Sequence, residues 1–154
     1  MKRLKRLNTK GVQVMSHVFG PVPSRRLGLS LGIDLIPAKT CTFDCLYCQV
    51  GRTTRRTLEP RPFVPVGDVA EEVEKRLQKT VPDVITLAGS GEPTLHSRID
   101  HVIAAIKEMT KTKVAVLTNG SLFWREDVRK RVLGADVIMP TLSSAFSHTF
   151  RIIH

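Results

Sequence analysis

The three cysteines of this 154-residue chain fall within one short segment, Cys41-Thr42-Phe43-Asp44-Cys45-Leu46-Tyr47-Cys48. A disulfide framework normally uses an even number of cysteines spread along the chain. Thiolates with this spacing can converge on one point, as a soft metal centre requires. An iron–sulfur cube normally takes four cysteines, one for each iron. Three cysteines would hold three irons and leave the fourth open to a ligand that is not protein.

The elements that must position these thiols alternate along the chain. Short apolar runs predict strands at residues 29–35, 83–88, 114–117 and 137–139. Apolar residues at helical spacing predict helices at residues 68–77, directly after Ser97, at 125–133 and at 144–153. Ser97 is the predicted N-cap of the second helix. The glycines and prolines of residues 11–28 predict turns and extended chain.

The order strand, loop, helix predicts an α/β fold with parallel strands and right-handed crossovers. Each distinctive segment then follows a strand. The four segments, in chain order, are the cysteines, Gly89-Ser90-Gly91-Glu92-Pro93, Thr118-Asn119-Gly120 and Pro140-Thr141-Leu142-Ser143. The carboxyl ends of parallel strands are where α/β proteins place their chemistry. We therefore expect the four segments to lie at one edge of the sheet.

The glycines of the segment 89–93 would let a ligand approach the backbone closely. A phosphate loop is disfavoured, because the third glycine and the Lys-Ser/Thr ending are missing and Glu92 would repel phosphate. The alternative for Glu92 is a carboxylate that caps the helix beginning near Ser97. The alternative for Asn119 is a plain Asn-Gly turn that leaves a strand.

The cysteine spacing, with Tyr47 just before the last cysteine, resembles the signature of the radical S-adenosylmethionine (SAM) enzymes. The resemblance implies a [4Fe–4S] cluster held by Cys41, Cys45 and Cys48. It also implies SAM chelated to the open iron, and cleavage of SAM by the reduced cluster to a 5′-deoxyadenosyl radical. The implied fold is a partial parallel (β/α) barrel of about three and a half strand–helix units, and the implied partner is a low-potential electron donor.

Ser90-Gly91-Glu92-Pro93 resembles the Gly-Gly-Glu motif of that superfamily, with Ser90 replacing the first glycine. The resemblance implies that the Ser90–Gly91 backbone and Glu92 receive the ammonium group of SAM. Asn119 stands where the superfamily often places a polar contact to SAM, and Ser143 follows the next strand. Tyr47 would flank the adenine or shield the cluster, with local packing as the alternative. The sequence names no general acid or base.

Three stretches are similar to the branch of the superfamily related to the wyosine-type tRNA-modifying synthases. They are Phe19-Gly20-Pro21-Val22-Pro23-Ser24-Arg25-Arg26-Leu27-Gly28, residues 40–54 and residues 90–95. Those synthases carry further cysteines and a lysine that engages pyruvate, whereas this chain has no cysteine outside 41–48. The superfamily core usually has six strand–helix units, and this sequence ends inside the fourth. We therefore expect either a second chain that completes the barrel or a truncated gene product.

The net charge of +10 lies almost entirely in residues 1–62, which hold 12 Lys or Arg and 3 Asp or Glu. Arg25 and Arg26 form one basic cluster, and further arginines follow the cysteines. A basic surface beside a site favours a polyanionic substrate such as RNA. The alternative is a solvated basic face. Residues 1–16 are predicted to be a disordered basic arm, and residues 17–154 the radical SAM core.

Non-catalytic interpretations of the three cysteines are a zinc knuckle, with His17 or His96 as the fourth ligand, and an electron carrier. An inactive remnant of a radical SAM protein is a third alternative. No apolar run approaches the ~20 residues of a membrane span, so no membrane partner is expected. Clustered thiols and the lack of an export signal favour the cytoplasm, where cysteines stay reduced.

Overall fold

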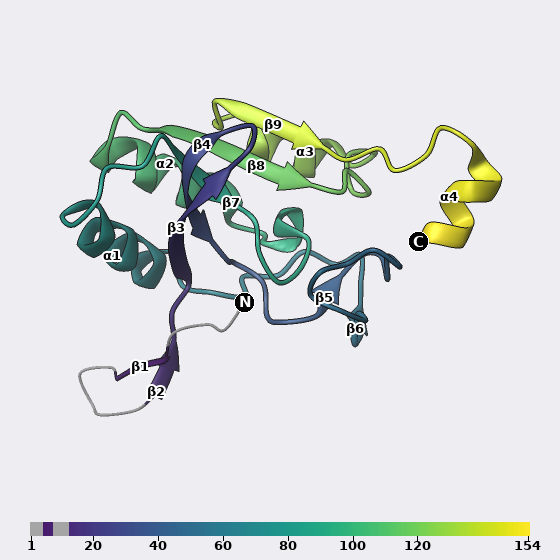
Figure 1. Cartoon of the computed structure of the whole chain (residues 1–154), viewed down its shortest axis with the longest axis horizontal. Coiled ribbons are helices and arrows are strands. Elements are labelled where there is room, and N and C mark those ends of the chain that lie inside the picture. Colours follow the sequence, from purple (N-terminus) through teal and green to yellow (C-terminus); the bar gives the residue numbers. More distant parts are fainter. Residues whose placement is uncertain (1–4, 8–12) are drawn as a thin grey trace.

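The strands of the main sheet are β3 (Val18–Ser24), β4 (Gly28–Ile33), β7 (Val84–Leu87), β8 (Lys113–Thr118) and β9 (Val137–Pro140). They belong to a computed structural model that describes residues 5–7 and 13–154. The strands lie side by side in the order β3-β4-β7-β8-β9 (Figure 1). β4, β7, β8 and β9 run parallel, and β3 pairs antiparallel with β4. The predicted α/β fold with a mainly parallel sheet is therefore confirmed.

Helices connect the parallel strands. They are α1 (Val66–Leu77), α2 (Ile99–Met109) and α3 (Glu126–Val132), with a short 3₁₀ helix, η1 (Pro93–Leu95), before α2. The last helix, α4 (Ser147–Ile153), follows β9 and lies away from the other three (Figure 1). It lies on the side of the short parallel pair β5 (Thr40–Cys41) and β6 (Arg55–Arg56). The architecture is a mainly parallel sheet whose strands are connected by helices, as expected for a partial β/α barrel.

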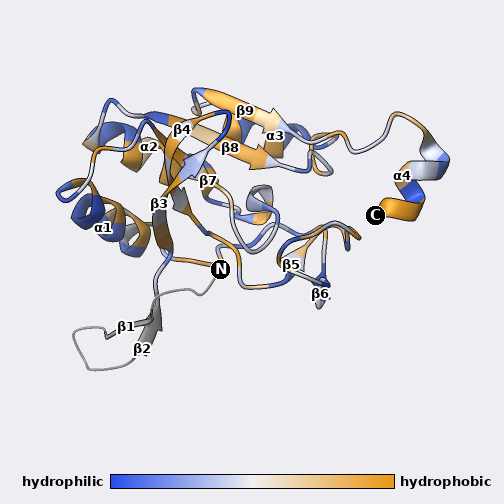
Figure 2. Ribbon diagram, in the orientation of Figure 1, coloured by the Kyte–Doolittle hydropathy of each residue, from blue (hydrophilic) through white to orange (hydrophobic). Residues whose placement is uncertain are grey.

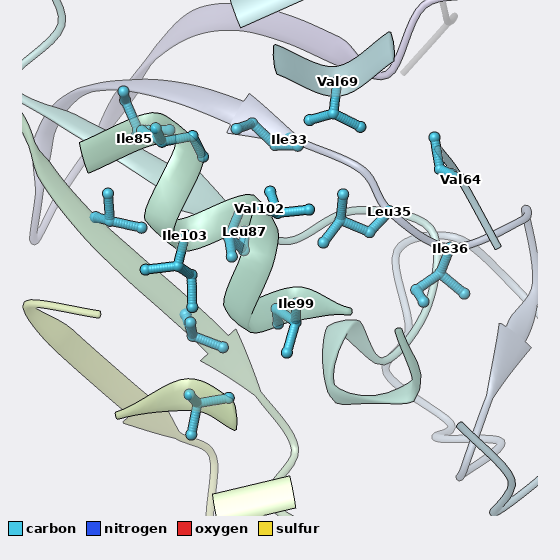
Figure 3. Packing of buried hydrophobic residues seen from close by; sticks show 14 of the residues in the cluster. Ile33, Leu35, Ile36, Val64, Val69, Ile85, Leu87, Ile99, Val102 and Ile103 are labelled. Carbon is cyan, nitrogen blue, oxygen red and sulfur yellow. The ribbon is translucent and has the colours of Figure 1, made fainter. Parts of the chain in front are cut away.

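The hydrophobic core lies between the sheet and α1, α2 and α3. Alternate residues of each central strand point toward these helices, because successive side chains of a strand face opposite sides. Figure 3 shows Ile33, Ile85 and Leu87 of the sheet gathered with Val102 and Ile103 of α2, and all five are buried. Figure 2 shows the complementary pattern, with hydrophobic residues concentrated in the strands and hydrophilic ones on the visible side of α1.

β3 is the element of the main sheet that the sequence did not predict. Its Gly20, Pro21 and Pro23 favoured turns and extended chain. They are accommodated because β3 is an edge strand, where prolines do not interrupt a ladder on both sides. The pairing of β3 with β4 also shifts register between Phe19 and Val22.

The predicted ends of the helices needed correction. Ser97 is not the N-cap of α2, because that position is held by Arg98 and has no side-chain cap. The backbone N–H of Ser97 instead donates to the Arg61 carbonyl at 3.0 Å. The first helix begins at Val66, two residues before the predicted start, and the last begins at Ser147 rather than at residue 144.

Part of the predicted disordered arm, residues 1–16, is described. β1 (Lys5–Leu7) and β2 (Gln13–Met15) pair antiparallel. Residues 1–4 and 8–12 lie outside the described residues, so the arm as a whole stays a prediction. In the part of the chain that is described, no helix is long and apolar enough to cross a membrane.

Val73 tests whether the packing of α1 on the sheet stabilises the fold. Its side chain is fully buried, so Val73→Ala should lower the free energy of unfolding by roughly 1.5–3 kcal/mol through lost burial and a cavity. Urea unfolding followed by circular dichroism measures the change. Val81→Ala removes the same atoms from a side chain that is 85% exposed, and its effect should stay within about 0.5 kcal/mol. Equal losses in the two variants would contradict the described core.

Candidate functional site

The cysteine loop leaves the sheet after β4 and is tied back on itself. Cys41 belongs to β5, which pairs with β6 on the return of the loop. The N–H of Cys48 donates to the Cys45 carbonyl at 3.1 Å, which closes a turn between the last two cysteines. The Asp44 carboxylate accepts a hydrogen bond of 2.7 Å from the Thr53 N–H. The loop that carries the thiols is therefore held by its own backbone and by one carboxylate.

All three cysteines are free thiols, and each is half-buried. Burial raises the pKa of the Cys41 thiol and that of the Cys45 thiol. The nearby Cys41 and Cys48 thiols add to the rise in the pKa of Cys45, because a second negative charge would repel the first. A cationic centre bound between the thiols would remove this repulsion, which is why thiolates so placed suit a metal.

The loop after β7 packs directly against the cysteine loop. A Cβ at Gly91 would lie 1.9 Å from the Thr40 carbonyl oxygen, so only glycine fits there. The Lys39 N–H donates to the Ser90 carbonyl at 3.0 Å. Between the two loops lies a small cavity of about 80 Å³, whose lining includes Cys41, Cys48 and Gly91. The structure thus brings the first and second predicted segments together.

Asp34 is a site residue that the sequence analysis missed. Its carboxylate is 4% exposed and accepts hydrogen bonds from the N–H of Ser90 at 3.0 Å and from the Ser90 hydroxyl at 2.6 Å. It also accepts a bond of 3.2 Å from the Ile36 N–H at the start of the cysteine loop. Its only signal in the sequence is a carboxylate at the end of an apolar run, next to Leu35 and Ile36.

Glu92 is 2% exposed and joins the ends of two strand loops. Its Oε1 accepts hydrogen bonds from the Thr94 N–H at 3.1 Å, the Thr94 hydroxyl at 2.6 Å and the Thr118 hydroxyl at 2.6 Å. Its Oε2 accepts a bond of 2.8 Å from the Asn119 N–H. Glu92 is the N-cap of η1, so the alternative of a capping carboxylate applies to η1 rather than to α2.

Asn119 connects this carboxylate to the cysteine loop. Its side-chain N–H group donates to the Thr42 hydroxyl at 2.8 Å and lies 3.7 Å from the Cys41 sulfur. Its side-chain oxygen accepts a bond of 2.9 Å from the Ser121 N–H, so a local turn is formed as well. The structure therefore brings Glu92, Asn119 and Cys41 into one connected network.

The two remaining predicted residues meet at the far side of the cysteine loop. The Tyr47 hydroxyl is hydrogen-bonded to the Ser143 hydroxyl. Beside them, α4 packs on the loop, because the Leu46 N–H donates to the Ile153 carbonyl at 2.9 Å. His154 Nδ1 lies 3.0 Å from the Cys45 sulfur, a contact that no spacing in the sequence indicated.

His96, one proposed fourth ligand of a zinc knuckle, is a core residue. It is fully buried, its Nε2–H donates to the Val64 carbonyl at 3.0 Å, and its Nδ1 accepts a bond of 3.3 Å from the Arg98 N–H. Both ring nitrogens are therefore engaged away from the cysteines. Burial lowers the pKa of His96, as expected for a neutral imidazole in a core.

The fold and site define an α/β protein with a thiol loop after the first parallel strand and a glycine–carboxylate loop after the second. The model of the radical SAM superfamily matches residues 35–144, more than two thirds of the chain. The chain belongs to the radical SAM superfamily. The matched segment contains all three cysteines, Glu92 and Asn119.

Relatives of known sequence match most of the chain. A UPF0026 protein of Methanocaldococcus jannaschii is 42% identical over 143 residues, which are 91% of this chain and 44% of that protein. A UPF0026 protein of Synechocystis is 43% identical over 79% of this chain and 46% of that protein. A Brachyspira hyodysenteriae protein named GTPase Obg is 40% identical over 97% of this chain and 22% of that protein. The chain spans less than half the length of these relatives.

The superfamily typically binds a [4Fe–4S] cluster and SAM, and the donor set agrees with the cluster in chemistry and in number. Three thiols on one loop leave one iron without a protein ligand. Across residues 5–7 and 13–154, however, no three His, Cys, Asp or Glu side chains are already arranged around one metal position. The thiols match such a cluster in chemistry and number, but in the described part of the chain their side chains are not preassembled for it.

Glu92→Gln tests the buried network. The amide group would turn an N–H toward a donor that now meets an oxygen, so we expect a loss of about 1–3 kcal/mol in the free energy of unfolding. Thermal and urea unfolding measure it. Glu126→Gln, at an exposed carboxylate paired with Lys130, is the matched control and should change stability by less than about 0.5 kcal/mol. A Glu92→Gln variant with an unchanged free energy of unfolding would argue against the network.

His96 should make stability depend on pH. Its pKa in the folded chain lies below the ordinary value of about 6.5, so the unfolded chain binds the proton first as pH falls. The contribution of neutral His96 to the free energy of unfolding is fully present above about pH 6.5. It is lost as the pH falls from there through the pKa that His96 has in the folded chain. His96→Gln should flatten the dependence between about pH 7 and 5, measured by urea unfolding at several pH values. If the free energy of unfolding of His96→Gln depends on pH as steeply as that of the native chain, other groups cause the dependence.

Proposed function

We propose that the chain binds a [4Fe–4S] cluster through Cys41, Cys45 and Cys48, binds SAM beside it, and cleaves SAM reductively to a 5′-deoxyadenosyl radical that acts on a further substrate. The observation that carries the proposal is the contact of the thiol loop with the loops after β7 and β8. Gly91 packs on Thr40, and Asn119 binds Thr42. This contact places thiols, a glycine loop and a carboxylate at one edge of a parallel sheet.

The chain's own residues would then bind and orient SAM. Glu92 Oε1 accepts three hydrogen bonds within the protein and Oε2 accepts one. Each carboxylate oxygen offers about two acceptor positions, so Oε2 still has one open. We assign Oε2 to the ammonium group of SAM, together with the Ser90–Gly91 backbone. Asn119 would contact polar groups of SAM. Tyr47 and Ser143, which are bonded to each other, would border the adenine.

RNA is the substrate class that we propose, with the similarity to the wyosine-type branch and the charge of residues 1–62 as support. Arg55 and Arg56 are exposed on β6, beside the strand that carries Cys41. Such a surface would attract a polyanion. A low-potential electron donor is a further proposed partner, and the free, clustered thiols favour a reducing compartment, the cytoplasm.

A second chain is a proposed partner at β9. Among the described strands, β9 is paired on one side only, with β8. An unpaired strand edge offers N–H and C=O groups to another strand. A partner strand there would extend the sheet in the direction of a closed barrel and would cover the site next to Ser143.

The proposal is tested without oxygen. The full chain is reconstituted with iron and sulfide, reduced, given SAM, and assayed for 5′-deoxyadenosine and methionine. We expect both products, and we expect Cys48→Ser to abolish them, because one iron would lose its ligand. Leu46→Ala changes an exposed side chain of the same loop and should keep the activity.

Other outcomes favour other functions. A brown cluster that leaves SAM untouched would favour an electron carrier or an inactive remnant. Binding of zinc alone, with no visible absorbance, would favour a structural knuckle formed by the three cysteines and refute the radical function.

A further inference from the structure

A groove of about 480 Å³ lies between the β3–β4 turn and the carboxyl ends of β8 and β9. Arg25 and Arg26 line it from the turn. Leu117 and Met139 line it from the two strands, and Thr141 lines it from the loop that follows β9. These residues are far apart in the sequence, so the groove exists only because the β3–β4 hairpin reaches the far strands of the sheet. It is distinct from the small cavity at the cysteines.

The turn that carries the two arginines is fixed at its base. Ser24 pairs with Gly28, so residues 25–27 form the turn. Gly28 has a φ of +70°, a left-handed conformation that favours glycine, and a Cβ there would lie 2.4 Å from the Asp83 carboxylate. That carboxylate accepts a bond of 2.6 Å from the Leu29 N–H. Asp83 therefore holds the turn in place and does not line the groove.

The groove has the chemistry of a phosphate-binding site with an apolar wall. Arg25 and Arg26 are exposed, and within residues 5–7 and 13–154 neither has a hydrogen bond or ion pair. None of the groove-lining residues in the described part of the chain is an Asp or a Glu. Two guanidinium groups without local partners favour an anion, and arginine forks match phosphate oxygens. Leu117 and Met139 offer an apolar surface to the rest of such a ligand.

The groove also adjoins the candidate SAM site. The Thr141 N–H donates to the Thr118 carbonyl at 2.9 Å, and the Thr118 hydroxyl binds Glu92. Leu117, in the groove wall, directly precedes Thr118. A molecule in the groove would therefore lie against the same strand ends that carry the site.

We infer that this groove binds a phosphate group of the substrate, with Arg25 and Arg26 as its ligands. The inference rests on the proposed function for the statement that the ligand is the substrate. The phosphate belongs to an RNA chain or to a small phosphorylated molecule, and the two sources share the same recognition by guanidinium groups.

The test is a binding titration on the full chain without added iron or SAM. One arm follows the arginine Nε–H resonances by NMR as inorganic phosphate is added. The other follows a labelled 12-nucleotide single-stranded RNA by fluorescence anisotropy at several salt concentrations. R25Q/R26Q removes both guanidinium charges. K111Q/K113Q removes two exposed charges at the opposite, amino end of β8 and is the matched control. Circular dichroism checks that both variants are folded.

We expect R25Q/R26Q to weaken phosphate binding by at least about tenfold, and K111Q/K113Q to leave it nearly unchanged. If RNA is the source, the slope of log K against log salt should fall by about 1.4 in R25Q/R26Q alone. Arginine-dependent phosphate binding without RNA binding would assign the source to a small phosphorylated molecule. Equal losses in both double variants, or no binding by the native chain, would overturn the inference.

The two proposals fail separately. A chain that binds phosphate through these arginines and does not cleave SAM would refute the proposed function and leave the phosphate site standing. A chain that cleaves SAM and shows no arginine-dependent phosphate binding would support the proposed function and refute the phosphate site.

Discussion

The buried carboxylate of Glu92 is the interaction on which the carboxyl edge of this sheet depends. A charge that is removed from water is costly unless hydrogen bonds replace its hydration. Glu92 receives four such bonds, from Thr94, Thr118 and Asn119. They couple η1 to the end of β8, and Asn119 extends the connection to Thr42, next to Cys41. The loops after three parallel strands are therefore connected by two side chains, those of Glu92 and Asn119.

Asp34 has a matching role on the other side of the glycine loop. It binds Ser90 and Ile36, so the loop after β7 is held between two buried carboxylates.

The contact of α4 with the cysteine loop is of another kind. His154 faces Cys45 with one nitrogen, while its Nε2 is buried without a hydrogen-bond partner in the described part of the chain. An unsatisfied buried nitrogen costs about 1–3 kcal/mol, which offsets part of the stability that the contact of α4 with the cysteine loop provides.

Much of the fold could be predicted from local patterns. The parallel strands and the helices between them follow from short apolar runs and from stripes such as Val102, Ile103 and Ile106, all of which are buried. β3 could not be predicted, because an edge strand with prolines looks like a loop until its partner β4 is known. The predicted N-cap of α2 was wrong, because Ser97 is hydrogen-bonded through its backbone to Arg61, which is distant in the sequence.

The sequence by itself determined the class of the protein, because three cysteines at this spacing and a Ser-Gly-Glu-Pro segment are local features that need no fold to be recognised. It also indicated that these segments meet, because parallel strands end at one edge. Only the tertiary structure decided that Asp34 holds Ser90, that Glu92 binds Thr118 and Asn119, and that Arg25 and Arg26 lie across from Met139. Each of these pairs joins different elements, and no local pattern encodes contacts between residues that only packing brings together.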